Sequence, residues 1–187
     1  MSTISEAKIV DKSICVCQGD IFKNVSYALG VPKPNESNEY IFPFAVIVSQ
    51  ACDVISMSDL AESKSGKATK IMPSIFLCPI YDEKAVKSGA HLDCFTESYN
   101  IEERYNVYTK KHQNIANIDW HYRFHCFSIQ NDDVLIEKSL IDFKHYFTVS
   151  IEYLLDNREN RVCRLEPIFA EQVTLKFATY LSRVAIP

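Results

Sequence analysis

A short polar run, SQACD at residues 49–53, directly follows a stretch of apolar and β-branched residues. A buried strand fixes the residues at its end while the loop after it exposes them, so a site is readily built there. Cys52 could act as a nucleophile or a soft metal ligand, with Asp53 as a base or second ligand and Gln50 as a binding residue. The alternative is that Cys52 fills an apolar gap and Asp53 caps a turn or the following helix.

A second run with chemical potential is YRFHC at residues 122–126. On a strand, Arg123 and His125 point to one face, which could bind a phosphate or carboxylate or carry out acid–base chemistry. The alternative is a half-exposed strand with cross-strand ion pairs. The further binding residues and candidate partners of this run are Tyr122, Asp142 and His145.

Metal and cofactor signatures are weak in this chain. Cys15 and Cys17 are two residues apart, and His121 and His125 are four apart on an expected strand, which separates them by about 13 Å. Zinc sites prefer spacings such as C-x-x-C or H-x-x-x-H; the two cysteines are closer than this, and the two histidines are too far apart along a strand. The sequence has neither a phosphate-binding glycine loop nor a G-x-S-x-G elbow. We therefore expect no metal and no cofactor.

The composition indicates one globular domain, residues 1–187, with 47% hydrophobic residues, ten Tyr and eleven Phe. The net charge of −4 disfavours a general nucleic-acid binder. Two basic clusters, Lys64/Lys67/Lys70 and Arg158/Arg161/Arg164, are interpreted as solvated faces. The seven irregularly spaced cysteines, the absence of a long apolar run and the polar N-terminus predict a cytoplasmic location without membrane contact.

The expected elements combine short strands with a few helices. Strands are predicted at residues 14–22, 42–49, 71–81, 105–109, 121–128, 134–143 and 146–150, and a loop at 30–39. A short helix and a loop are expected within 56–69, a helix at 82–88 that ends at Gly89, and a turn at 157–160. A final helix over about 166–184 begins at Pro167, with Arg183 in its last turn. Its apolar stripe consists of Phe169, Val173, Phe177, Leu181 and Val184.

These elements predict a mainly β (α+β) fold. Its barrel-like antiparallel core spans about residues 14–155, with short helical insertions and the C-terminal helix packed on the sheet.

Three short motifs occur in the order found in the PemK/MazF-like toxin barrels. They are Gly19-Asp20-Ile21, the proline-led strand 43–49 that ends in Ser, and Pro79-Ile80. The chain resembles that family over residues 1 to about 80, with a further match at 134–155, where Asp142-Phe143 and Thr148-Val149 resemble a closing strand. The resemblance implies a small barrel.

The departures from this family concern its chemistry. Family members usually carry a catalytic Arg just before the proline, and this chain has Phe42 there. After Pro-Ile the family prefers Ser or Thr, and this chain has Tyr81. The resemblance therefore implies the fold more than it implies ribonuclease activity.

Three functional hypotheses follow. The first is a non-catalytic binding or assembly module that acts through a protein partner in a bacterial stress-response, toxin–antitoxin or phage-defence system, because the acidic balance and many aromatics suit protein interfaces. The second is a metal-independent endoribonuclease that uses Cys52, Asp53, Arg123 and His125, with RNA as its partner. The third is an enzyme or sensor that depends on Cys52.

Overall fold

The computed structural model describes residues 7–28, 39–64, 69, 71–93, 123–130 and 135–182. The loop expected before Glu39 and the strand expected at 105–109 lie outside these residues. So do the following single positions: Lys67, Lys70, His121, Tyr122, Arg183 and Val184.

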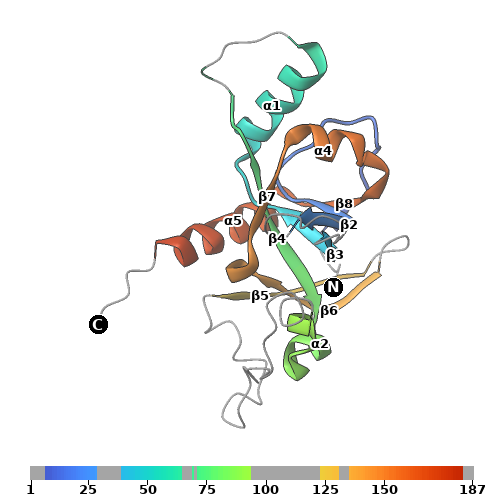
Figure 1. Cartoon of the computed structure of the whole chain (residues 1–187), viewed down its shortest axis with the longest axis vertical. Coiled ribbons are helices and arrows are strands. Elements are labelled where there is room, and N and C mark those ends of the chain that lie inside the picture. Colours follow the sequence, from blue (N-terminus) through green and yellow to red (C-terminus); the bar gives the residue numbers. More distant parts are fainter. Residues whose placement is uncertain are drawn as a thin grey trace, which may run out of the picture.

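The fold is mainly an antiparallel sheet that curves into a half-barrel, with helices on both of its faces (Figure 1). The strand order is β1-β8-β2-β3-β4-β6-β5, and β7 pairs with β4 beside this path. The strands are β1 (Ala7–Lys8), β2 (Asp20–Ala28), β3 (Glu39–Ile47), β4 (Ile75–Asp82), β5 (Phe124–Gln130), β6 (Leu135–Asp142), β7 (Phe147–Val149) and β8 (Arg161–Leu165). The α-helices are α1 (Ala51–Ser63), α2 (Glu83–Ser88), α4 (Ile151–Asp156) and α5 (Pro167–Leu181). Short 3₁₀ turns span Ala90–Leu92, Phe143–His145 and Arg158–Asn160. The mainly β, α+β prediction is confirmed.

The central strands are the apolar runs that the sequence marked as buried. In β4 every residue from Ile75 to Tyr81 except Phe76 is buried, as expected for a strand with packing on both faces. One side of β4 pairs with β3, with Phe44 opposite Ile80. The other side pairs first with β7 and then with β6. Pro79, which has no N–H to donate, lies between these two ladders.

Two hydrophobic cores lie on opposite faces of the sheet. One contains Val54 of α1 and Leu154 of α4, together with Phe42 and Leu77. The other contains Val173 and Phe177 of α5, packed on strand residues such as Ile80. The sheet is thus the layer between two sets of helices, and the expected packing of the C-terminal helix on the sheet is confirmed.

Local capping signals place two helices where they were expected. In α2, the Asp82 carboxylate accepts hydrogen bonds from the backbone N–H groups of Lys84 and Ala85, and Gly89 ends the helix at φ 79°. In α5, Pro167 occupies the first turn. The predicted turn near residues 157–160 is also present as a 3₁₀ turn.

The apolar stripe of α5 is shorter than its sequence suggests. Val173 and Phe177 are buried, but Leu181 is 51% exposed. Figure 1 shows the reason, because α5 extends beyond the edge of the sheet and its last turn has no strand beneath it. The prediction that Leu181 belongs to the buried face is wrong.

Four local predictions need correction. Helix α1 begins at Ala51 rather than near Ser56, and β2 runs from Asp20 to Ala28 rather than over 14–22. Strand β8 and helix α4 were not predicted at all, because residues 151–165 mix apolar and charged types without a clear period. Two arginines interpreted as a solvated face lie inside the structure, since the side chain of Arg161 is fully buried and that of Arg164 is 17% exposed.

Candidate functional sites

The SQACD run forms the start of α1 rather than a loop. Gln50 is the N-cap residue, and Cys52 and Asp53 lie exposed in the first turn. The Cys52 Sγ is 3.8 Å from Gln50 Oε1 and 3.6 Å from Asp53 Oδ1. Asp53 suits the positive end of the helix dipole. A shallow pocket of about 450 Å³ opens here, lined by Cys52, Asp53, Ser56, Thr69, Ile71, Met72 and Pro73. The role of Cys52 as a nucleophile remains a prediction.

Arg123 has the partners that the sequence suggested. Its Nε donates to Asp142 Oδ1 at 2.8 Å, and its Nη2 donates to Asp142 Oδ2 at 2.6 Å. This bidentate pair is largely shielded from solvent, because the side chain of Asp142 is fully buried and that of Arg123 is only 18% exposed. The same Nη2 lies 3.3 Å from His145 Nε2.

His145 connects this ion pair to Tyr81. Because a guanidinium can only donate, His145 Nε2 accepts from Arg123, and the proton of the neutral ring must be on Nδ1. That Nδ1 lies 3.1 Å from Asp142 Oδ2 and 3.1 Å from the Tyr81 hydroxyl. His91 packs against Tyr81 with ring centroids 5.1 Å apart. We call Tyr81, His91, Arg123, Asp142 and His145 the histidine cluster.

Burial keeps the histidines of this cluster neutral. It lowers the pKa of His145 to about 4, because desolvation and the nearby Arg123 charge outweigh the attraction of Asp142. Burial also lowers the pKa of His91. Since the His145 lone pair accepts from Arg123 and Arg123 is held by Asp142, these groups bind one another. In this arrangement the cluster stabilises the β5–β6 end of the sheet. The Nε2 lone pair of His145 is occupied by the hydrogen bond from Arg123, so this atom does not act as a general base.

Lowering the pH should destabilise the protein through His145. The unfolded chain takes up this proton near the ordinary pKa of 6.5, whereas the folded protein resists it down to about 4. The stabilisation is therefore fully present above about pH 6.5 and is lost as the pH falls to about 4. Its full size is about 3 kcal/mol, because the pKa is 6.5 in the unfolded chain and about 4 in the folded protein. The lowered pKa of His91 acts in the same direction.

Urea unfolding at a series of pH values between about 7 and 4 measures this effect. The His145→Asn variant keeps an N–H donor for Asp142 but does not titrate, so its free energy of unfolding should fall less steeply than that of the wild type. Parallel curves for the two proteins would contradict the assignment.

His125 lies in a different environment from Arg123. Its Nδ1 is 2.8 Å from the Nζ of Lys176 on α5. Arg123 precedes the first residue of β5 and reaches Asp142 and His145 instead. The expectation that Arg123 and His125 form one polar face is therefore wrong, because alternation holds only inside a strand and Arg123 lies just before it.

The structure does not bring the four predicted catalytic residues together. Figure 1 shows α1, which carries Cys52 and Asp53, at one end of the molecule and β5, which carries His125, on the other side of the central strands. The two runs therefore form two separate sites.

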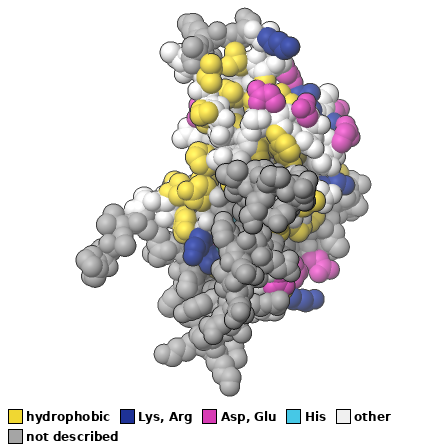
Figure 2. Space-filling view, in the orientation of Figure 1, with side chains coloured by type: hydrophobic (Ala, Val, Ile, Leu, Met, Phe, Trp, Pro, Cys, Tyr) yellow, Lys and Arg dark blue, Asp and Glu magenta, His cyan; other side chains and the backbone are white. Residues whose placement is uncertain are grey.

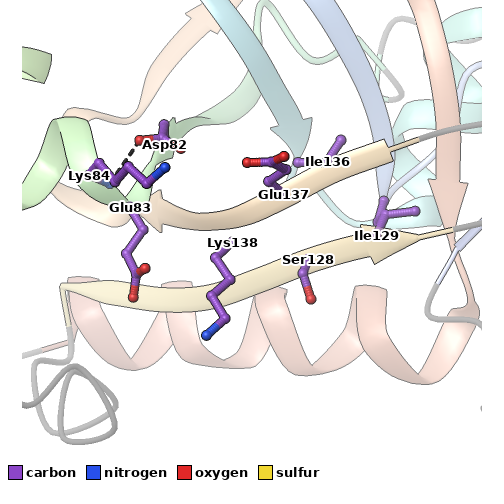
Figure 3. Close-up of a pocket in the computed structure, with 8 residues that line it drawn as sticks. All are labelled: Asp82, Glu83, Lys84, Ser128, Ile129, Ile136, Glu137 and Lys138. Carbon is purple, nitrogen blue, oxygen red and sulfur yellow. Dashed lines mark hydrogen bonds between the residues drawn. The ribbon is translucent and has the colours of Figure 1, made fainter.

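A second pocket, of about 550 Å³, lies between β6, β5 and the start of α2 (Figure 3). Acidic and basic side chains are mixed around this pocket, so its lining does not favour a ligand of either charge. Its lining residues are Asp82, Glu83, Lys84, Ser128, Ile129, Ile136, Glu137 and Lys138.

A buried network of polar contacts was missed by the sequence analysis. Arg161 Nη1 donates to Asp20 Oδ2 at 3.1 Å, and both side chains are fully buried. Arg164 donates to Asp20 through Nε at 2.5 Å and through Nη2 at 3.0 Å. The one sequence signal for this network was an Asp at the start of an apolar strand, which needs a cation once it is buried.

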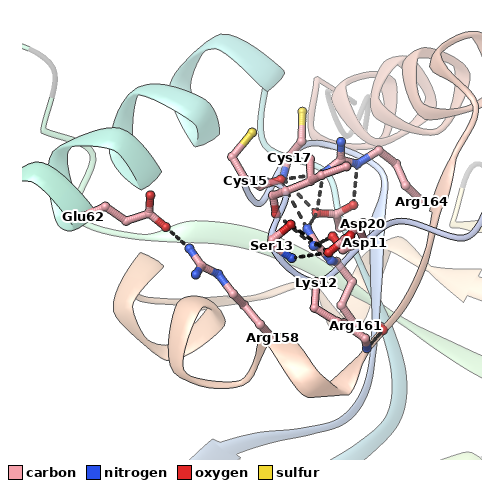
Figure 4. A network of polar contacts seen from close by, with 11 residues as sticks. Asp11, Lys12, Ser13, Cys15, Cys17, Asp20, Glu62, Arg158, Arg161 and Arg164 are labelled. Carbon is pink, nitrogen blue, oxygen red and sulfur yellow. Dashed lines mark hydrogen bonds and ion pairs between the residues drawn. The ribbon is translucent and has the colours of Figure 1, made fainter.

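The same arginines hold the segment of residues 11–17 against the sheet (Figure 4). Arg161 donates to the carbonyl groups of Asp11, Ile14 and Cys15, and Arg164 also donates to that of Cys15. Asp20 Oδ2 in turn accepts from the backbone N–H of Cys17 at 2.9 Å. The Asp20 carboxylate and the two guanidinium groups thus supply the hydrogen bonds that a neighbouring strand would otherwise give to this stretch of backbone.

Comparison of the chain with protein-family models, curated proteins and solved structures gives no match. Within the described ranges, no group of three or more His, Cys, Asp and Glu side chains is arranged to hold a metal ion. No helix in the described part of the chain is long and apolar enough to cross a membrane.

Proposed function

We propose that this chain is a protein-binding module whose contact surface lies where α5 meets β4 and β7. The observation that carries the proposal is a group of aromatic and aliphatic side chains, exposed or partly exposed around the buried Phe177, which we call the aromatic patch. It consists of Phe76, Tyr146, Phe177, Tyr180 and Leu181.

Three rings of the patch pack against one another, and Tyr180 and Leu181 follow Phe177 by three and four residues, a spacing that places them on the same side of α5. The ring centroids are 6.0 Å apart for Phe76 and Tyr146, 5.4 Å for Tyr146 and Phe177, and 6.3 Å for Phe76 and Phe177. Phe76 is 37% exposed, Tyr146 40% and Leu181 51%. Phe177 is buried beneath them and anchors the rings to the second core. Figure 2 shows hydrophobic side chains gathered on the visible face from α1 down to α5.

Such a surface suits a protein partner. Aromatic residues are enriched at protein interfaces because they remove a large apolar area from water at a small cost in side-chain freedom. Contiguous exposed apolar patches, unlike single exposed residues, mark interaction sites. The patch is also built on a rigid base, since β4 and β7 are paired and α5 packs on the sheet.

The physiological context that we propose is a bacterial stress-response, toxin–antitoxin or phage-defence system. This part of the proposal is supported by the family resemblance of residues 19–21, 43–49 and 79–80 alone. A non-catalytic role agrees with Phe42 at the position of the family's catalytic Arg.

Purification of the tagged protein from its host, with the co-purifying molecules identified by mass spectrometry, tests the proposal. We expect a stoichiometric protein partner. The double variant Tyr146→Asp, Leu181→Asp should weaken the affinity for this partner at least about tenfold, or by about 1.4 kcal/mol. A photo-crosslinking residue at position 146 should attach to the same partner.

The matched control is Ile168→Asp, at a position that is also on α5 and is 61% exposed but lies outside the patch. It should retain the partner. Retention of the partner by the double variant, or its loss from the control, contradicts the patch as the contact surface. Co-purifying RNA or DNA in place of a protein would contradict the proposal.

A further inference from the structure

We propose that Cys15 and Cys17 form a two-thiolate site for a soft, thiophilic metal ion such as Cu(I). Thiolates are the protein ligands that such ions prefer. The inference is independent of the aromatic patch and of any enzymatic role for Cys52.

The two thiols lie on the same side of the backbone. Val16, between them, is fully buried in the first core, and Cys15 and Cys17 are both half-buried. Figure 4 shows the two sulfur atoms on the same side of the segment.

The backbone of this pair is fixed before any ion binds. The Cys15 carbonyl accepts from Arg161 at 3.2 Å and from Arg164 at 2.7 Å. The Cys17 N–H donates to Asp20 at 2.9 Å. Because these contacts lie on the backbone, both thiol groups are left for a ligand, and little conformational freedom is lost when one binds.

The spacing is short enough for one ion to bridge both sulfur atoms. Two residues of chain separate alpha carbons by at most about 7 Å, and the upper limit for a disulfide is about 6.8 Å. A metal–sulfur bond of about 2.3 Å, taken twice, spans about 4.6 Å between sulfurs in a linear S–metal–S unit. Two side chains on one side of the segment at this spacing can lean toward each other to span that separation.

The ligand count selects the class of ion. No group of three or more His, Cys, Asp and Glu side chains suited to a metal occurs in the described parts of the chain. Zinc takes four ligands in structural sites, whereas a soft monovalent ion accepts two thiolates. On binding, each thiol releases its proton to solvent and forms one metal–sulfur bond, and the oxidation state of Cu(I) does not change.

Anaerobic titration of the reduced full-length protein with Cu(I), in competition with a chromogenic Cu(I) chelator, tests the site. We expect one tightly held Cu(I) per chain. Cys15→Ser and Cys17→Ser should each weaken binding by more than about 100-fold, because even changes outside the ligand shell cost 10–100-fold.

The control variants are Cys52→Ser and Cys126→Ser, whose thiols are exposed in the described part of the chain, and Cys94→Ser outside it. They should bind Cu(I) as the wild type does. Absence of tight binding, or equal losses in the controls, would overturn the proposal. X-ray absorption on the wild-type complex is independent of whether any variant folds; it should show two sulfur neighbours, and a shell with more sulfur or with nitrogen would also overturn it.

Discussion

Replacing Asp20 with alanine should lower the free energy of unfolding by about 3–5 kcal/mol, because it leaves two arginines without their carboxylate. Arg161 is fully buried and Arg164 largely so, and both donate to this one side chain. Uncompensated guanidinium groups cannot deprotonate to relieve the cost. The loss is of the size that unfolds many single domains of marginal stability.

Asp20→Asn separates the charge from the shape. Asparagine fills the same volume but removes the negative charge, so it should destabilise the protein nearly as much as alanine does. Urea unfolding measures the free energy of unfolding of both variants. Amide hydrogen exchange reports on the Cys17 N–H, which donates a hydrogen bond to Asp20 in the wild type.

A surface pair provides the control for the Asp20 variants. Lys8 and Glu166 lie 3.4 Å apart with side chains that are 51% and 34% exposed. Glu166→Gln should cost at most about 1 kcal/mol. If Asp20→Ala cost no more than this, the buried network would not stabilise the fold.

Replacing Gly19 with alanine should destabilise the protein by about 2–5 kcal/mol. Gly19 has φ 80°, a conformation in which a β-carbon costs about 1–2 kcal/mol. A β-carbon built at this position would also lie 2.8 Å from the Cβ of Ala170 on α5. Relief of that clash requires α5 to move away from the sheet, and overpacking of this kind costs about 1–3 kcal/mol.

A double-mutant cycle separates the two causes. Ala170→Gly removes the atom that the new methyl group would meet but leaves the strain at φ 80°. We expect a coupling energy of about 1–3 kcal/mol between positions 19 and 170, with the strain remaining in the double variant. Purely additive effects would show that α5 does not approach Gly19 as closely as the structure places it.

Local sequence rules were sufficient for some of the regular elements, although not for β8 or α4. The apolar runs that became β3 and β4, the Asp82 and Gly89 caps of α2 and the Pro167 start of α5 each depend on a residue and its near neighbours. Such signals act through backbone sterics and local hydrogen bonds, which are the same in any fold. The mainly β class followed from their sum.

The candidate sites were predicted only in part. The pairing of Arg123 with Asp142 and His145 was suggested from residue types and is present. The joining of Cys52 and Asp53 with Arg123 and His125 was also suggested, and the structure separates them. Both suggestions used the same kind of chemistry, and the strand order distinguishes them: β5 and β6 are neighbours in the sheet, whereas α1 follows β3.

The sequence by itself determined the apolar strands β3 and β4, the helices α2 and α5 and the mainly β class, because these depend on contacts within a few residues. The tertiary structure decided that Arg161 is buried, that Leu181 is exposed and that Cys15 and Cys17 face the same side. Each of these depends on what lies opposite: the carboxylate of Asp20 beneath Arg161, the end of the sheet before Leu181, and the core that holds Val16. Long-range neighbours set burial and charge compensation, and no local pattern specifies them.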